Sequence, residues 1–205
     1  MSPSTHIRED LIQEQILQAA RQLFQQHGLS KVTMDDVAKA IGKGRSSLYY
    51  YYKSKDEIFD AVMDAEIAAI LTEMTRAVGQ ASSLEQKVRA FFVTKLEMLG
   101  KRRSYFNSID VGMDAEEMSN FTKAKHAIHG RIIKQEGILL RQLITEGMEK
   151  GELRAMDQKD LNVLIFVLLS SLHGLKREII HEDDFSLIKP AIDTLTNLIL
   201  HGLEK

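Results

Sequence analysis

The chain contains no cysteine and no tryptophan, and it has only two prolines among its 205 residues. Without cysteine it can form no disulfide, no thiolate metal site and no thiol nucleophile. Its longest strongly apolar stretch, residues 161–175, contains an asparagine, two serines and a histidine and is too short for a membrane span. No apolar run near the N-terminus has the pattern of a signal peptide. These absences predict a cytoplasmic protein that has no membrane partner.

Motifs that would indicate catalysis or cofactor binding are missing as well. The sequence has no glycine-rich phosphate loop and no defensible nucleophile–base pattern. His126 and His129 stand three residues apart, as metal ligands on a helix do, but no carboxylate or thiolate completes the set. We therefore expect no cofactor, no metal and no enzymatic activity, with an all-helical enzyme as one alternative.

Charge is unevenly distributed along the chain, although the formal net charge is only −2. Residues 1–55 carry a net charge of +3, whereas residues 56–205 carry −5. A basic N-terminal part followed by an acidic body favours a nucleic acid as the partner of the N-terminal part.

The basic part contains the signals of two short helices joined by a tight turn. Thr33 followed by Asp36 predicts a helix start, because a hydroxyl can cap the free N–H groups and a carboxylate suits the positive helix end. Gly42 predicts the end of that helix, and Gly42 and Gly44 can both take the positive φ that a sharp turn needs. A second helix is expected over residues 45–51. This pattern predicts a helix-turn-helix, whose second helix enters the major groove of DNA.

Cations and hydroxyl groups cluster in and after this motif. Residues 43–55 include four cations and no acid. Lys and Arg supply the salt-dependent attraction to phosphates, and hydroxyl groups fix the position on the duplex. The candidate DNA-binding residues are Thr33, Lys43, Gly44, Arg45, Ser46, Ser47, Tyr49, Tyr50, Tyr51 and Lys55.

These candidates divide by expected role. Sequence preference is assigned to the residues that can face the groove, namely Arg45, Ser46, Ser47 and Tyr50. Thr33, Tyr49 and Lys55 are expected to contact phosphates. Lys43 can contact either a base or a phosphate. Arg8 and Arg21 are expected to be solvated charges, with phosphate contacts as the alternative.

The residues that carry a family resemblance are Thr33, Val37, Ala38, Ile41, Gly42, Leu48, Tyr49, Tyr51, Tyr52, Lys53, Ser54, Lys55 and Ile58. Together they resemble the DNA-binding signature of the tetracycline-repressor (TetR) family, strongly over roughly residues 7–60. Two residues depart from the family pattern: Lys43 stands where the family usually has an apolar residue, and Gly44 stands where it often has a serine that caps the recognition helix. The resemblance implies a DNA-binding domain over residues 1–53 and a helical ligand-binding and dimerisation domain over residues 54–205.

Apolar residues recur at helical spacing along the rest of the chain and predict further helices. Their expected ranges are 7–27, 54–78, 83–99, a short helix within 101–122, 116–149, a helix beginning at 157, and 185–203. Residues 1–6 are expected to form a loose arm. The sequence thus predicts an all-α protein of about nine helices, in which a three-helix DNA-binding domain precedes the helical body.

The last two helices are the expected dimer interface. The stretch 161–175 is apolar almost all round, and the helix at 185–203 has one apolar face. Two such helices from each of two chains can close a four-helix interface, which matches how the family forms homodimers. A homodimer would present two recognition helices to a two-fold-related operator in double-stranded DNA.

The resemblance also implies a small-molecule effector bound in the body. The residues that could line its site are Met63, Ile67, Phe92, Lys95, Leu96, Leu99, Phe106, Met113, Phe121, Ile165, Leu169 and His173. Most suit a packed core equally well. Lys95 either extends its stem to the rim of the body or reaches an acidic group on a ligand. His173 is either a polar ligand contact or a satisfied histidine of the core or interface.

The function expected from these observations is transcriptional regulation. A homodimeric repressor would bind a palindromic operator and be released by a small apolar or amphipathic effector. The alternative is a DNA-binding activator, or a regulator of the same fold that responds to no ligand.

Overall fold

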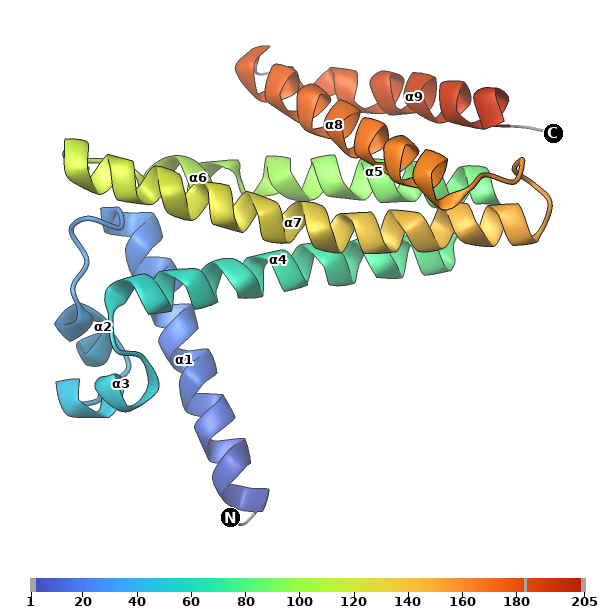
Figure 1. Ribbon diagram of the computed structural model, residues 1–205. Coiled ribbons are helices and arrows are strands. Elements are labelled where there is room, and N and C mark those ends of the chain that lie inside the picture. Colours follow the sequence, from blue (N-terminus) through green and yellow to red (C-terminus); the bar gives the residue numbers. More distant parts are fainter. Residues whose placement is uncertain (1–2, 183, 204–205) are drawn as a thin grey trace. The chain divides into compact units, whose positions relative to one another are not determined.

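The computed structural model describes the backbone of residues 3–182 and 184–203, and the side chains of these residues except 3–8, 103, 106, 180 and 182. Within these ranges it contains nine α-helices, one 3-10 helix and no strand (Figure 1). The helices are α1 (Pro3–His27), α2 (Met34–Ala40), α3 (Arg45–Tyr51), α4 (Lys55–Gln80), α5 (Leu84–Lys101), α6 (Arg103–Ile109), α7 (Ala115–Glu149), α8 (Gln158–Glu182), η1 (Phe185–Leu187) and α9 (Ile188–Leu203). The predicted all-α fold of about nine helices is confirmed.

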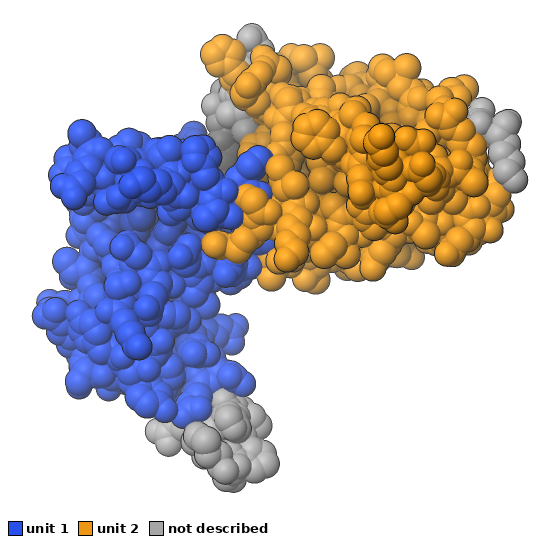
Figure 2. Space-filling view, in the orientation of Figure 1, with its two compact units in different colours: residues 1–67, 102–129 blue, residues 68–101, 130–205 orange. Residues whose placement is uncertain are grey.

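The chain forms two compact units (Figure 2). Unit 1 comprises the residues up to Ile67 together with Arg102–His129, and unit 2 comprises Ala68–Lys101 and Gly130–Lys205. This division differs from the expected boundary between residues 53 and 54. The difference arises because α6 and the first part of α7 belong to the same unit as the first three helices. As a result, α4 and α7 each lie partly in unit 1 and partly in unit 2.

The docking of α1 on α6 explains why unit 1 extends beyond the first three helices. Gly28 closes α1 with a φ of +80°, and the N–H of Leu29 donates to the carbonyl oxygen of Ile109 at 2.9 Å. A Cβ atom at position 28 would lie 2.8 Å from the carbonyl oxygen of Val111. Only glycine tolerates both the left-handed backbone and this close approach. The expected end of this helix at residue 27 is therefore confirmed, and Gly28 also makes a tertiary contact.

The first helix is longer than the sequence pattern predicted. Residues 3–6 were expected in a loose arm, but α1 already begins at Pro3. Proline suits the first turn of a helix, because its φ is already helical and its missing N–H would have no partner there. The expectation of a loose arm is thus wrong for residues 3–6, and residues 1 and 2 lie outside the described ranges.

Serine caps mark two helix starts that lie next to the expected residues 54 and 83. The hydroxyl of Ser54 accepts from the N–H of Glu57 at 3.2 Å before α4, and that of Ser83 accepts from the N–H of Gln86 at 3.2 Å before α5. The return bond of the first box is shifted by one residue, since the Glu57 carboxylate accepts from the N–H of Lys53 at 2.7 Å. The caps fix where the two helices begin.

Unit 2 has a continuous apolar core built from parts of α4, α5, α7, α8 and α9. Its largest fully buried side chains are those of Met74, Phe91, Phe92, Leu140, Ile144 and Leu153. The helix α7 runs unbroken through Gly137, where an added Cβ would be 3.7 Å from Leu169 and 3.8 Å from Ile165. This glycine thus provides a small contact point between α7 and α8.

Candidate nucleic-acid interface

Helix α2 begins with a reciprocal cap in unit 1. The hydroxyl of Thr33 accepts from the N–H of Asp36 at 3.2 Å, and the Asp36 carboxylate accepts from the backbone N–H of Thr33 at 2.9 Å. The hydroxyl also donates to that carboxylate at 2.7 Å, and these bonds from Thr33 lower the pKa of Asp36. The helix start predicted at Thr33 is confirmed, and its hydroxyl proton is directed to Asp36.

The turn between α2 and α3 depends on one glycine with positive φ. Gly42 has a φ of +66°, and the N–H of Lys43 donates to the carbonyl oxygen of Ala38 at 2.9 Å. Gly44 does not share this conformation: its φ of −75° and ψ of 154° are those of an extended residue, and it precedes α3 without a side-chain cap. The prediction of positive φ at Gly44 is therefore wrong, because Gly42 alone completes the turn.

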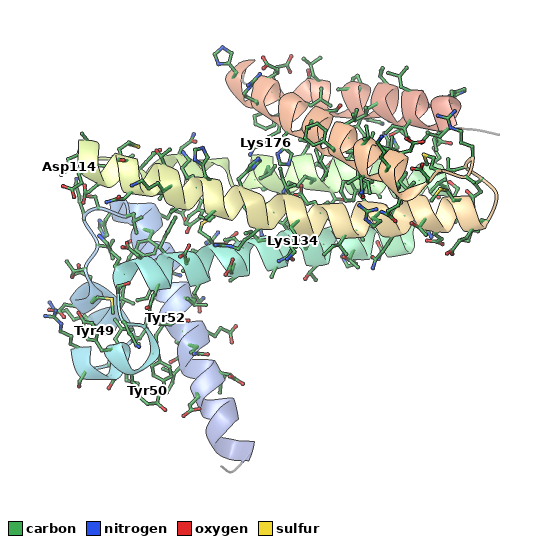
Figure 3. All side chains as sticks on the ribbon, viewed as in Figure 1. Tyr49, Tyr50, Tyr52, Asp114, Lys134 and Lys176 are labelled. Carbon is green, nitrogen blue, oxygen red and sulfur yellow. The ribbon has the colours of Figure 1, made fainter. Side chains whose placement is uncertain are left out.

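The orientation of α3 is set by its buried face. Leu48 is fully buried, as are Val37 and Ala38 of α2. Residues on the other faces of α3 are exposed, among them Arg45, Ser46, Ser47, Tyr49 and Tyr50. Figure 3 shows Tyr49 and Tyr50 on this helix. The two helices thus present a polar and aromatic surface in the geometry of a helix-turn-helix.

Arg45 is held in position on this surface by two neighbours. Its Nε lies 3.2 Å from Oδ1 of Asp35, and its Nη2 donates to the hydroxyl of Tyr49 at 3.2 Å. The guanidinium carbon also lies 5.4 Å from the centre of the Tyr49 ring. The hydrogen bond to Tyr49 and the charge of Asp35 raise the pKa of Arg45. Asp35 is a partner that the sequence pattern did not identify.

Tyr50 is the most exposed large apolar residue of the motif, with 71% of its surface accessible. Its hydroxyl donates to Oε1 of Glu9 on α1 at 3.3 Å, and the nearby Glu9 charge raises the pKa of Tyr50. Its ring contacts that of Tyr51 edge to face, with centroids 5.0 Å apart. Lys43, Ser47, Tyr50 and Tyr51 also line a small pocket beside α1.

Lys55 has protein partners in place of the phosphate that the sequence predicted. Its ammonium donates to the carbonyl oxygen of Leu29 at 2.8 Å and to that of Ser30 at 3.2 Å. The same loop is held from α7, since the Ser30 hydroxyl donates to the Glu117 carboxylate at 2.8 and 2.9 Å. These carbonyl groups explain a cation at the positive end of α4 without a bound anion.

Comparison with known proteins identifies the motif. Residues 16–62 match the family described as bacterial regulatory proteins, tetR family. The matched segment includes the whole helix-turn-helix and the start of α4. The chain belongs to the TetR family. It is accordingly a transcriptional regulator with a helix-turn-helix DNA-binding region.

The relatives of this TetR-family chain are regulators rather than enzymes. The transcriptional regulator SrpR of Pseudomonas putida is 23% identical over 205 residues, which cover 97% of this chain and 90% of SrpR. The uncharacterised regulator YhgD of Bacillus subtilis (strain 168) is 25% identical over 157 residues, covering 75% of this chain and 76% of YhgD.

Solved structures show the same fold. The fatty acid degradation regulator FadR from Bacillus halodurans has a TM-score of 0.65 at 18% identity, covering 92% of this chain and 94% of FadR. FadR from Bacillus subtilis, solved in complex with stearoyl-CoA, has a TM-score of 0.64 at 14% identity. The match covers 93% of this chain and 99% of that FadR chain. At such identities the likeness concerns the fold alone.

Arg21 of this TetR-family regulator takes part in a partly buried ion-pair cluster of unit 1, in contrast to its expected role as a solvated charge. It forms an ion pair with Glu66 of α4, and Arg102 pairs with the same carboxylate at 2.6 Å. The Arg21 guanidinium also lies over the ring of Tyr105, 4.8 Å from its centre. Burial favours the neutral acid, but the hydrogen bonds from Arg102 and Arg21 together lower the pKa of Glu66. The side chain of Arg8, which was assigned the same role, lies outside the described ones.

The residues expected to line one effector site are divided between the two units. Those of unit 1 are Met63, Ile67, Met113 and Phe121. Those of unit 2 are Phe92, Lys95, Leu96, Leu99, Ile165, Leu169 and His173. Phe92, Leu96, Ile165 and Leu169 are packed in the core of unit 2, with Leu99 against it. The side chain of Phe106 is not among the described ones.

Lys95 and His173 do meet in the structure, through a residue that sequence reasoning missed. Lys95 forms an ion pair with Glu136 of α7, and Nε2 of His173 lies 3.3 Å from the other oxygen of that carboxylate. The Lys95 side chain is 4% exposed, so the expectation that it extends to the rim is wrong. Glu136 could have been found from its spacing, since it lies four residues from both Ile132 and Leu140 on the apolar stripe of α7.

Among the described residues, no group of three or more histidines, cysteines, aspartates and glutamates could hold a metal ion. The search covered His126 and His129 of α7. None of the helices in the described ranges combines the length and the apolar character that a membrane crossing requires.

Proposed function

We propose that this regulator is a homodimeric repressor that binds a palindromic operator in double-stranded DNA and is released by a small apolar or amphipathic effector. The observation that carries the proposal is the exposed face of α3, which Leu48 directs away from the core of unit 1. Arg45, Ser46, Ser47 and Tyr50 offer donors and acceptors that suit base edges in the major groove. Tyr49 and Lys43 carry hydroxyl and ammonium groups that can contact phosphates, whereas the Thr33 hydroxyl donates to Asp36 and supports the interface by capping α2.

The roles of the remaining candidates follow from their surroundings. Gly44 has no side chain and permits DNA to approach the first turn of α3 closely. Tyr51 is half-buried and positions Tyr50 through their ring contact. Lys55 holds the loop before α2 by its two bonds to carbonyl oxygens. We therefore assign Lys55 a positioning role in DNA binding and leave the phosphate contacts to the exposed residues.

A dimer is supported by apolar side chains that are exposed on the last two helices. Val163, Phe166 and Val167 form one stripe on α8 and are 56%, 70% and 49% exposed. Leu198 of α9 is 69% exposed. Exposed apolar patches on a folded chain indicate a binding surface, and a second copy of this chain would cover them. The dimer would bring two α3 helices to successive major grooves, about 34 to 36 Å apart.

An effector is supported by the size of the helical body and by the charged group in the core of unit 2. The FadR relative from Bacillus subtilis was solved with stearoyl-CoA, which is an amphipathic molecule. Helix α4 is continuous from Lys55 to Gln80 and therefore connects the DNA-binding unit covalently to the body. A coupling free energy of about 1 to 3 kcal/mol between the sites would weaken operator binding roughly 5- to 150-fold.

The test is binding of the purified full chain to DNA from upstream of its own gene at two salt concentrations. We expect tight, salt-dependent binding to a short two-fold site. Arg45→Ala should lower affinity about 10-fold or more and relax the preference at one position of the site, because a bidentate base contact is lost. Lys123→Ala, which removes an exposed cation on α7, is the matched control and should leave binding unchanged.

The same assay separates positioning from phosphate contact at Lys55. Lys55→Met should weaken binding without changing the slope of log affinity against log salt, whereas loss of a phosphate contact would reduce the slope by about 1. Sequence-blind binding that is insensitive to Arg45→Ala would contradict the proposed interface. Repression is checked with a reporter gene, whose expression should rise when the regulator is deleted; a fall would identify an activator.

A further inference from the structure

Three helices of unit 2 each contribute one polar residue to a cluster in its core. By their positions in the chain, Lys95 belongs to α5, Glu136 to α7 and His173 to α8. One oxygen of Glu136 pairs with the Lys95 ammonium, and the other lies 3.3 Å from Nε2 of His173. The side chains of Lys95 and Glu136 are 4% and 1% exposed, while that of His173 is 17% exposed. The cluster is thus buried at Glu136 and reaches solvent at His173.

The surroundings of this cluster are apolar. Phe92 and Leu96 flank Lys95 on α5, Leu140 follows Glu136 by one turn of α7, and Leu169 precedes His173 by one turn of α8. All four belong to the apolar core of unit 2. Burying two charges in such a place is costly, and replacing a buried ion pair by apolar residues often leaves a fold equally stable or makes it more stable. Folding alone does not explain why this cluster is charged.

The hydrogen-bonding capacity of the cluster indicates which ligand it would accept. One oxygen of Glu136 faces the Lys95 ammonium and the other faces His173, so a second cation would have to share this carboxylate with both of them. The ammonium of Lys95 carries three N–H donors, of which the described contacts direct one at Glu136. The donors of a buried ammonium beyond the one that faces Glu136 favour an acceptor group, such as an oxygen of an oxyanion. The apolar neighbours suit a hydrocarbon tail.

We propose that Lys95 and His173, oriented by Glu136, bind the oxyanion head of an amphipathic effector, such as a carboxylate or a phosphate, while the tail lies among the apolar residues of α5, α7 and α8. This inference rests on the proposed function, in that it names the chemistry of the effector. Lys95 donates to the oxyanion, His173 lies toward solvent where the head group enters, and Glu136 keeps the ammonium in place.

The experiment uses the purified full chain and four probes with the same tail: dodecanoate, dodecyl phosphate, dodecanol and dodecylamine. Thermal unfolding measures binding, since a ligand of the native state raises Tm. Operator affinity is measured in parallel with and without each probe. We expect dodecanoate or dodecyl phosphate, or both, to raise Tm and to weaken operator binding at least about 5-fold. Dodecanol should bind more weakly, and dodecylamine should have no effect.

The decisive variant replaces both charges of the buried pair, Lys95→Met with Glu136→Met, so that no unpaired charge remains in the core. Its matched control is Lys87→Met with Glu146→Met, which removes a more exposed pair between the same two helices, 2.8 Å apart. We expect the first double variant to bind the operator as the wild type does. It should need at least about 10-fold more of an anionic probe than the wild type for the same loss of operator affinity. The control should respond normally.

A single variant at the edge of the cluster guards against a folding defect in the core. His173→Asn changes a partly exposed residue and should reduce the response to the anionic probes while operator binding without a probe stays unchanged. The inference is overturned if these variants respond like the wild type, if dodecylamine is the active probe, or if no anionic probe raises the Tm of the wild type. Failure of the proposed function is distinct, because it would appear as absent operator binding before any probe is added.

Discussion

At the scale of single residues, Glu66 links the acid stability of unit 1 to two arginines. Its folded-state pKa lies below the ordinary value of 4.5 because Arg102 and Arg21 bind the ionised form against the cost of burial. The resulting stability is present above pH 4.5 and is lost as the pH falls through the depressed pKa. We expect Glu66→Gln to lower the free energy of unfolding by about 2 kcal/mol at pH 7.

Urea unfolding at several pH values checks this expectation. The difference between wild type and Glu66→Gln should shrink as the pH falls below 4.5, since the wild type then also loses the ionised carboxylate. Glu73→Gln is the control, because Glu73 pairs with Arg76 on the exposed side of the same helix. It should change stability little. A constant difference between wild type and Glu66→Gln across the pH range would show that the arginines do not act through the charge of Glu66.

At the scale of elements, the end of α1 depends on a glycine that also forms a helix-to-helix contact. Gly28→Ala should destabilise the chain by more than about 1 kcal/mol, because the new Cβ meets a backbone oxygen of Val111 and the φ is positive. Gly42→Ala should cost less, since it has a positive φ but open space around it. Gly130→Ala, inside α7 with open space, should stabilise by about 0.5 to 1 kcal/mol. Thermal and urea unfolding of the three variants would reveal whether the close approach, rather than the backbone alone, matters at Gly28.

The elements that could be predicted from sequence are those fixed by neighbours along the chain. Thr33 and Asp36 are three residues apart, so their pattern indicated where α2 begins. Gly42 likewise indicated where α2 ends and the turn begins. The length and order of the helices followed from such local signals.

Contacts between distant positions could not be predicted in this way. Lys55 looked like a phosphate contact because the carbonyl oxygens that bind it belong to a loop that the local pattern does not place nearby. Arg21 and Lys95 each looked solvated for the same reason, since their partners Glu66 and Glu136 lie far along the chain. For a long charged side chain, the sequence states the charge but not the partner.

At the scale of the whole molecule, operator binding by this TetR-family regulator should depend on two copies of the chain. Phe166→Asp places a charge in the exposed apolar stripe of α8, where a partner chain would have to bury it. We expect this variant to be monomeric by light scattering. Its affinity for the full two-fold site should fall about 100-fold or more, because the second recognition helix no longer binds at high effective concentration.

A matched variant and a second DNA separate loss of the dimer from loss of the fold. Ile138→Asp changes an apolar residue of α7 that is 53% exposed, and it should leave both mass and affinity unchanged. Phe166→Asp should still bind a single half-site as weakly as one wild-type recognition helix does, since its residue lies far along the chain from the helix-turn-helix in unit 1. If Phe166→Asp were monomeric yet bound the full site as tightly as the wild type, one chain would suffice for recognition and the two-fold operator would have to be abandoned. If it stayed dimeric, the interface would lie on another face of unit 2, and the exposed stripe of α8 would need a different partner.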